Sequence, residues 1–217
     1  MKLLLVSLWL AGAAWAEEAK VELVPETTGQ TWSVVGPRTV APGSNVLEAW
    51  AGYPSISAGW LRGVSSGINV GARVGFVYGV EGMFRDSAPG LRVQGAFKLR
   101  LLDSGKVSLG LTFDPGVLYY ASYLQGARWG LTFPVGFRLG IAASSALSVA
   151  VLVDVPMWVE FGTFGGFNLP ILTGGGVEYF ITSQLAVFVR ARIGPTLRTG
   201  RPAEVTFDAA LGLGYRF

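Results

Sequence analysis

The chain contains no cysteine and no histidine among its 217 residues. Without cysteine it can form neither a disulfide nor a thiolate metal site, and it lacks the residue that a lipoprotein anchor requires. Without histidine it lacks the commonest general base and the commonest transition-metal ligand, so Ser-His-Asp and Cys-His catalytic arrangements are excluded. We therefore expect no metal site and no cofactor, and we do not expect an enzyme.

Charged residues are also scarce, since Asp, Glu, Lys and Arg make up 14% of the chain. The formal net charge is only +3 at pH 7, and nucleic-acid binding requires clustered basic residues, so we expect no nucleic-acid partner. Although 51% of the residues are hydrophobic, no long apolar run follows the first 16 residues. No transmembrane helix is therefore expected.

The first 16 residues, MKLLLVSLWLAGAAWA, have the pattern of a secretory signal peptide. One lysine precedes an apolar run to Leu10, and small residues end in Ala14-Trp15-Ala16, which is typical of a cleavage site. The run is too short to span a bilayer as a helix, although an uncleaved anchor is the alternative. We expect cleavage after residue 16 and transport across the inner membrane.

Apolar and polar residues alternate along most of the remaining chain. In INVGARVGFVYGVE, residues 68–81, apolar residues take every second position, and mostly glycine and polar residues take the others. Because successive side chains of a strand point to opposite faces, this period predicts a strand with one apolar face. The same period recurs, with no charged residue on the apolar face, at 91–101, 107–114, 128–141, 147–157, 171–181, 185–193 and 205–217.

Most of these segments are longer than an ordinary strand, which has about 5–6 residues. A tilted strand needs about 9–11 residues to cross a bilayer. The sequence therefore predicts an all-β fold, a transmembrane antiparallel up-and-down β-barrel with its apolar face towards lipid. Short turns alternate with longer connections, as in barrels of the bacterial outer membrane. The turns are 102–106, 142–145 and 182–184, and the longer connections are 82–90, 115–127, 158–170 and 195–204.

The strand count depends on residues 45–67, whose alternation is imperfect. They are best explained by a hairpin of strands 45–53 and 56–64 around Tyr53-Pro54-Ser55, which gives ten strands. The alternative is an eight-stranded barrel with 45–63 as an arm or plug. The predicted organisation is a signal peptide at 1–16, a periplasmic arm at 17–44 and the barrel at 45–217. Entry of the arm into the lumen is a further alternative.

The terminal segment VTFDAALGLGYRF resembles the last strand of bacterial outer-membrane β-barrel proteins. The pattern ends in Phe217, with Tyr215, Leu213 and Leu211 at alternate positions upstream. The resemblance implies that these four residues are the signal for the outer-membrane assembly machinery. In size the chain is similar to the small barrels of the OmpA and OmpX sort. Its expected partners are outer-membrane lipid and that machinery, and we expect a monomer.

The charged face of the strands should line the lumen. In a barrel of eight to ten strands, side chains nearly fill the interior. Either arginines and carboxylates pair there and close the core, or excess positive charge lines a narrow, porin-like pore for small anions. Inward glycines either ease curvature or leave space. The predicted lumen charge network is Arg73, Glu81, Arg92, Lys98, Arg100, Asp114, Arg128, Arg138, Asp154, Glu178, Arg190, Arg192 and Asp208.

Aromatic residues gather in two of the predicted outer loops: Tyr119, Tyr120, Tyr123, Trp158, Phe161 and Phe164. They could bind an apolar ligand or a surface partner, or they could anchor the barrel at the lipid interface. A membrane enzyme that uses Asp154 and Glu178 is a third hypothesis, which nothing in their spacing supports. The sequence therefore favours a structural barrel or narrow pore over a binding protein or an enzyme.

Overall fold

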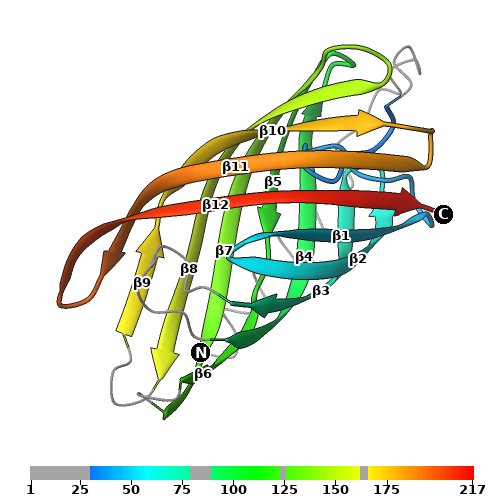
Figure 1. The fold of residues 1–217 in the computed structure, drawn as a ribbon. Helices are drawn as coiled ribbons and strands as arrows, with labels where there is room; N and C mark the ends of the chain where they lie inside the picture. Colours follow the sequence, from blue (N-terminus) through cyan, green and yellow to red (C-terminus); the bar gives the residue numbers. More distant parts are fainter. Residues whose placement is uncertain (1–29, 79–88, 123–125, 162–165) are drawn as a thin grey trace, which may run out of the picture.

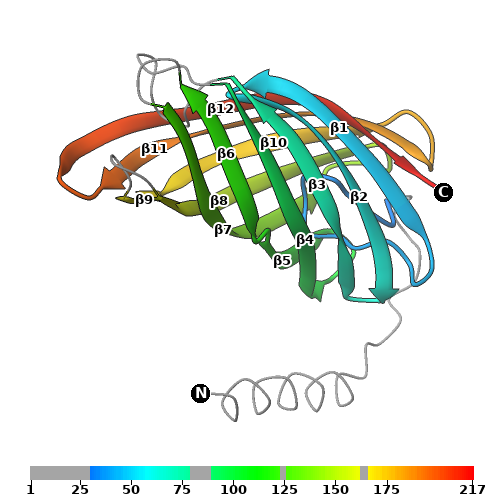
Figure 2. The ribbon, with the colours of Figure 1, turned by 90° about the horizontal axis from the view of Figure 1, so that it is seen from below.

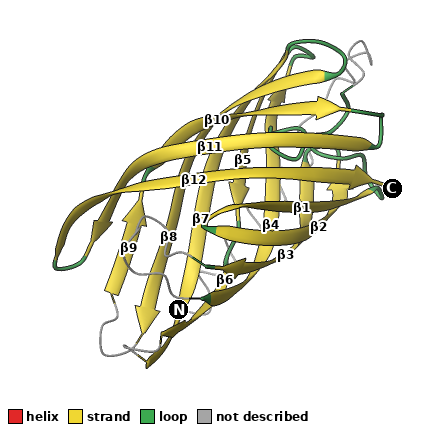
Figure 3. Cartoon of the chain, in the orientation of Figure 1, coloured by secondary structure: helices red, strands yellow, loops and turns green. Residues whose placement is uncertain are grey.

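The computed structural model describes residues 30–78, 89–122, 126–161 and 166–217 (Figure 1). All regular structure in these ranges is β (Figure 3). None of the described residues belongs to a helix that is long and apolar enough to cross a membrane. The predicted signal peptide, 1–16, and the first part of the predicted arm, 17–29, lie outside the described residues and stay predictions.

Twelve strands form one antiparallel sheet that closes on itself, because β1 pairs with β12. The strands are β1 (Asn45–Tyr53), β2 (Ser55–Ser65), β3 (Ile68–Val77), β4 (Gly90–Asp103), β5 (Val107–Phe113), β6 (Gly116–Ser122), β7 (Gly126–Ala142), β8 (Leu147–Phe161), β9 (Gly166–Pro170), β10 (Leu172–Phe180), β11 (Leu185–Arg198) and β12 (Arg201–Arg216). β5 and β6 both lie between β4 and β7, and β9 and β10 both lie between β8 and β11. The barrel therefore has ten strand paths. The ten-strand prediction is confirmed and the eight-strand alternative is wrong.

The two divided paths are interrupted beside prolines. Between β5 and β6, Pro115 has no N–H to donate to the ladder, and its carbonyl accepts a 2.7 Å hydrogen bond from Gly95. Between β9 and β10, the N–H of Ile171 donates to the carbonyl of Pro195 at 2.9 Å. The first interruption matters for the interior, because the side chain of Asp114 reaches into the lumen there.

The two faces of the sheet are oriented as the alternation predicts. Large apolar side chains cover the outside: Val74, Leu91 and Leu211 are 51%, 54% and 63% exposed. Charged residues between them, such as Glu48 and Asp154, are buried inside. A closed barrel with an apolar outer surface can satisfy its backbone in a bilayer without exposing a sheet edge. Leu211, Leu213 and Tyr215 are on the outer face of β12.

Connections at one end of the barrel are short: 66–67, 104–106, 143–146 and 181–184. We call this the short-turn end and the opposite one the loop end. At the loop end the predicted long connections 115–127, 158–170 and 195–204 are wrong, because β6, β8, β9, β11 and β12 occupy most of them. The β11–β12 hairpin therefore extends well past the β1–β2 turn, and the rim at the loop end is uneven (Figure 1).

Residues 30–44 correct the expectation of a periplasmic arm. This stretch, which we call the plug segment, runs inside the barrel near the short-turn end (Figure 2). Trp32, Val35 and Val40 are buried there. Trp32 packs edge-on against Phe180 of β10, with ring centroids 5.5 Å apart. The alternative in which the segment enters the lumen therefore describes these residues.

Candidate functional site: the barrel lumen

The plug segment is fixed to the rim of the short-turn end. It donates a side-chain hydrogen bond to a backbone carbonyl in each of the four turns. The bonds are Gln30 Nε2 to Ser144 (2.7 Å), Trp32 Nε1 to Ser183 (3.0 Å), Thr39 Oγ1 to Ser66 (2.7 Å) and Arg38 Nη2 to Gly105. Every turn at this end therefore contributes an acceptor, and the segment is attached to the rim on all sides.

Two charged residues of the barrel wall hold the deepest part of the plug segment. The buried carboxylate of Glu178 accepts a 2.7 Å hydrogen bond from the N–H of Val34 and another from the hydroxyl of Ser33. The buried Lys98 ammonium donates to the carbonyls of Ser33 (2.7 Å), Val34 (3.2 Å) and Gly36 (3.0 Å). Both residues were expected in a charge network, but their partners are mainly plug backbone.

Inward glycines give the plug segment its space. A Cβ added at Gly140 would lie 2.7 Å from Cδ of Pro37, and one at Gly176 would lie 2.7 Å from Cγ1 of Val35. A Cβ at Gly110 would lie 2.8 Å from Cβ of Pro37. At these positions the glycines leave space for the plug.

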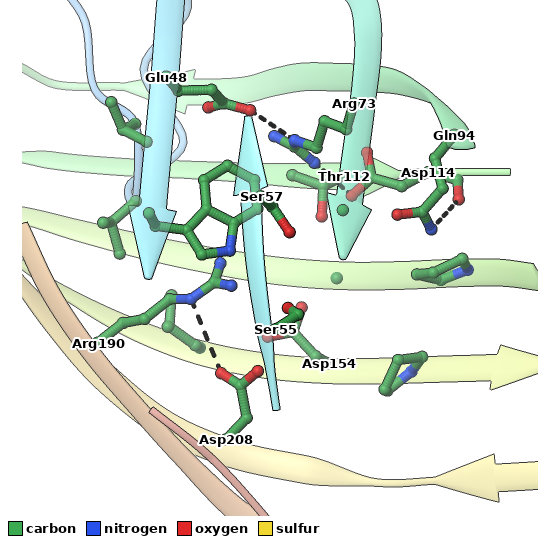
Figure 4. A pocket seen from close by; sticks show the side chains of 18 of the residues that line it. Glu48, Ser55, Ser57, Arg73, Gln94, Thr112, Asp114, Asp154, Arg190 and Asp208 are labelled. Carbon is green, nitrogen blue, oxygen red and sulfur yellow. Dashed lines mark hydrogen bonds and ion pairs between the residues drawn. The ribbon is translucent and has the colours of Figure 1, made fainter. Parts of the chain in front are cut away.

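Above the plug segment, arginines and carboxylates pair along the inner face of the barrel, between strands that are neighbours or one strand apart. Arg73 of β3 bonds both Glu48 of β1 and Asp114, and so joins one wall of the barrel to the next (Figure 4). Glu48 was not among the predicted lumen residues. The alternation of the first hairpin is imperfect, so the sequence did not identify Glu48 as a lumen residue. Its position between Leu47 and Ala49 nevertheless follows the period-2 pattern.

A second cluster centres on Asp154 of β8. Its Oδ2 lies 2.6 Å from Nη1 of Arg138 and 2.7 Å from Nη1 of Arg192. Arg192 also reaches Asp208 Oδ1, 2.9 Å from its Nη2. Gly136 leaves space for this cluster, since a Cβ there would lie 3.0 Å from Nη2 of Arg138. Asp154 and Glu178 therefore have separate partners and do not form the carboxylate pair that the enzyme hypothesis needs.

Towards the loop end the lumen becomes apolar and aromatic. Tyr120 and Trp158 are each 2% exposed and cluster with Val77 and Leu118. Trp158 donates a 2.8 Å hydrogen bond to Glu160, and Glu160 pairs with Arg128 at 3.2 Å. The Arg128 guanidinium lies 5.9 Å from the Tyr120 ring centroid.

The prediction of outer-loop aromatics is therefore partly wrong. Tyr120 and Trp158 are strand residues that face the lumen, whereas Tyr119 and Phe161 are strand residues on the outer surface. Tyr123 and Phe164 lie outside the described residues, as does Glu81 of the predicted charge network. Arg100 pairs with Asp103 at 3.2 Å near the short-turn end. Arg38 of the plug lies 3.3 Å from the same carboxylate.

A cavity of about 90 Å³ remains between the ion pairs. It extends from Val34 and Val35 of the plug segment to Ser55, the first residue after the β1–β2 turn. Five arginines and four carboxylates line it: Arg73, Arg92, Arg138, Arg190, Arg192, Glu48, Asp114, Asp154 and Asp208. Figure 4 shows labelled members of both groups pointing towards one another across this space. Within the described ranges, no group of carboxylates is arranged to hold a metal ion.

Comparison with known proteins gives distant structural likenesses only. No family model and no curated protein matches the chain. The outer-membrane protease OmpT from Escherichia coli is 10% identical, with 80% of this chain and 93% of that chain covered and a TM-score of 0.47. The N-terminal β-barrel domain of Pseudomonas aeruginosa OprF is 10% identical, covering 82% and 100%, with a TM-score of 0.35. An outer membrane channel from Pseudomonas putida F1 is 9% identical, covering 90% and 100%, with a TM-score of 0.42.

All three of these proteins are bacterial outer-membrane β-barrels. All three TM-scores lie below 0.5, and no identity exceeds 10%. The fold is therefore assigned from the closed strand pairing of this chain, and its function is inferred from the residues that line the lumen.

Proposed function

We propose that this protein is an outer-membrane β-barrel whose lumen is closed, and that it serves as a structural barrel, not as an open pore. The outer surface supports the membrane part of the proposal, because apolar side chains cover a sheet that has no edge. Its partners in this proposal are outer-membrane lipid and, through Leu211, Leu213, Tyr215 and Phe217, the assembly machinery. It acts as a monomer.

One observation carries the closed state: the plug segment is bonded to all four turns of the short-turn end and to two charged groups inside. The ion pairs of Arg73 and Asp154 narrow the lumen beyond it. A buried charge is stable only when it is paired or hydrated, and the space found between these pairs is a cavity of about 90 Å³.

Single-channel conductance of the refolded protein in a planar bilayer tests this proposal. Folding is verified first by the difference in gel mobility between boiled and unboiled detergent samples. We expect silence from the folded wild-type protein. Steady anion-selective steps that change with Arg138→Glu would contradict the closed barrel and establish a pore lined by the charged face.

A narrow anion-selective pore is the second candidate, and the charge of the cavity favours it. The cavity lining has one more arginine than carboxylates, and positively charged linings set anion selectivity. In this candidate the plug segment is displaced before the lumen conducts. A silent wild type together with anion-selective steps from Glu178→Ala, which removes two bonds to the plug, would support it.

A further inference from the structure

The guanidinium of Arg190 differs from the other lumen arginines in its partners. In the part of the chain that the structure describes, it makes no hydrogen bond, although its side chain is only 19% exposed. Its Nε forms an ion pair with Oδ1 of Asp208 at 3.7 Å, a distance beyond hydrogen-bond range. This Nε is buried without a hydrogen-bond acceptor, which is unfavourable for an N–H donor.

The obvious acceptor for Arg190 is already occupied. Asp208 Oδ1 lies 3.1 Å from Nε and 2.9 Å from Nη2 of Arg192, so that neighbour holds the carboxylate more closely. Arg190 instead lies over the ring of Trp50, with its guanidinium carbon 5.2 Å from the ring centroid. A cation–π contact of this kind fixes the guanidinium plane but satisfies none of its N–H groups.

Arg190 lines the cavity of about 90 Å³, which has space for several water molecules or for one small polar group. The hydroxyl-bearing side chains of Ser55 and Ser57 line the same cavity. Arg73, which also borders it, lies over the same Trp50 ring at 5.7 Å. Trp50 thus has a guanidinium near its ring from each of two barrel strands, β3 and β11.

We propose that this cavity binds an oxyanion, the carboxylate or phosphate group of a small ligand, with Arg190 as its principal donor. A planar guanidinium recognises both groups by two parallel hydrogen bonds. The ligand enters from the loop end, because the cavity reaches Ser55 beside the β1–β2 turn while the plug segment covers the opposite end. This site requires no conduction, so a silent barrel is compatible with it.

Ligand-detected NMR tests the site with two probes, acetate and inorganic phosphate, at constant ionic strength. The full mature chain is refolded in detergent, and its fold is verified by gel mobility. We expect saturable binding of at least one probe to the wild type, weakened about tenfold or more by Arg190→Gln, because hydrogen bonds to charged groups are strong. The probe that binds more tightly identifies the class of the ligand group.

The matched control is Arg128→Gln, which removes a lumen guanidinium that lies outside the cavity lining and is paired with Glu160. It should leave probe affinity unchanged. Arg190→Lys keeps the charge next to Asp208 but loses the planar fork, so it should also weaken binding and serves if the glutamine variant does not fold. The proposal would be overturned if the folded wild type showed no saturable binding of either probe. It would also be overturned if the Arg190 variants bound the probes as tightly as the wild type, or if Arg128→Gln lost as much affinity as Arg190→Gln.

Discussion

The N–H of Val34 donates a 2.7 Å hydrogen bond to the carboxylate of Glu178, which is 144 residues further along the chain. The same carboxylate accepts from the hydroxyl of Ser33. This contact joins the plug segment to β10 inside the barrel, near the short-turn end. A charged acceptor for a backbone donor is stronger than a neutral one, so Glu178 is a principal determinant of where the plug segment lies.

Glu178→Ala should loosen the plug segment. The variant removes both acceptors and leaves the Val34 N–H without one, which costs about 1–3 kcal/mol of docking free energy. Trypsin then gains access to the bond after Arg38, which is buried in the wild type. Limited proteolysis of the refolded barrel, followed by mass spectrometry, should show faster cleavage at this bond.

Glu160→Ala is the control for that experiment. It removes a buried carboxylate that pairs with Arg128 near the loop end, away from the plug segment. Cleavage after Arg38 should stay as slow as in the wild type. If Glu178→Ala were equally resistant, the carboxylate would not be what holds the segment in place.

Gly140→Ala should displace the plug by steric contact alone. Its Cβ would lie 2.7 Å from both Pro37 Cδ and Ser108 Oγ, and a proline ring cannot rotate away. Because the chain has no cysteine, Val35→Cys supplies a single thiol as reporter. This buried position should react slowly with a water-soluble thiol reagent in an otherwise wild-type chain, and faster when Gly140→Ala is added.

Gly75→Ala is the matched glycine control. A Cβ there would lie 2.6 Å from Oγ of Ser57 and 3.6 Å from the carbonyl oxygen of Ile56, and none of its three nearest atoms belongs to the plug segment. Labelling of Val35→Cys should keep its slow rate in this background. Equal rates in the two alanine backgrounds would show that glycine at 140 is not needed to seat the plug.

Asp154→Asn should be the most destabilising of the lumen carboxylate changes. It leaves both Arg138 and Arg192 without their shared charge partner, and breaking a buried pair in this way costs about 3–5 kcal/mol. Urea unfolding of the barrel in lipid measures the loss. Asp103→Asn is the comparison, since that carboxylate is 20% exposed and should cost less. If Asp154→Asn lowered the free energy of unfolding no more than Asp103→Asn, the Asp154 cluster would be hydrated and would contribute little to stability.

The strand faces and the ten paths followed from sequence because a membrane barrel imposes opposite polarity on alternate residues. That signal fails where the interior is also apolar. Leu118, Tyr120 and Trp158 face the lumen, so polarity does not alternate along β6 and the end of β8, and both stretches resembled loops.

The plug segment left an even weaker signal. Lys98 binds the plug segment through backbone carbonyls, which every residue possesses. This contact therefore requires no particular side chain at 33–36 and cannot be predicted from the residue types there. Arg73 was predicted as a lumen charge, but its partner Glu48 could not be chosen from many carboxylates without the strand register. Pairing in three dimensions needs that register, and one period-2 pattern does not supply it.

The depth of the apolar outer surface gives a test of membrane placement itself. Val74 and Val64 are both 51% exposed on the outside of the barrel. Val74 lies within β3 opposite Ala58 and Val93, whereas Val64 is next to the turn at 66–67. The two positions therefore differ in depth while sharing residue type and exposure.

Val74→Arg should destabilise the folded barrel in lipid by about 2–4 kcal/mol, and Val64→Arg by about 0–1 kcal/mol, because the cost of a lipid-facing arginine falls from the midplane to the interface. Arg62 already lies on the outer face near the short-turn end, which fits tolerance of a charge at that depth. Urea unfolding in vesicles measures both values. Equal costs would place the two positions at the same depth, and a negligible cost at Val74 would remove lipid from the outer surface altogether.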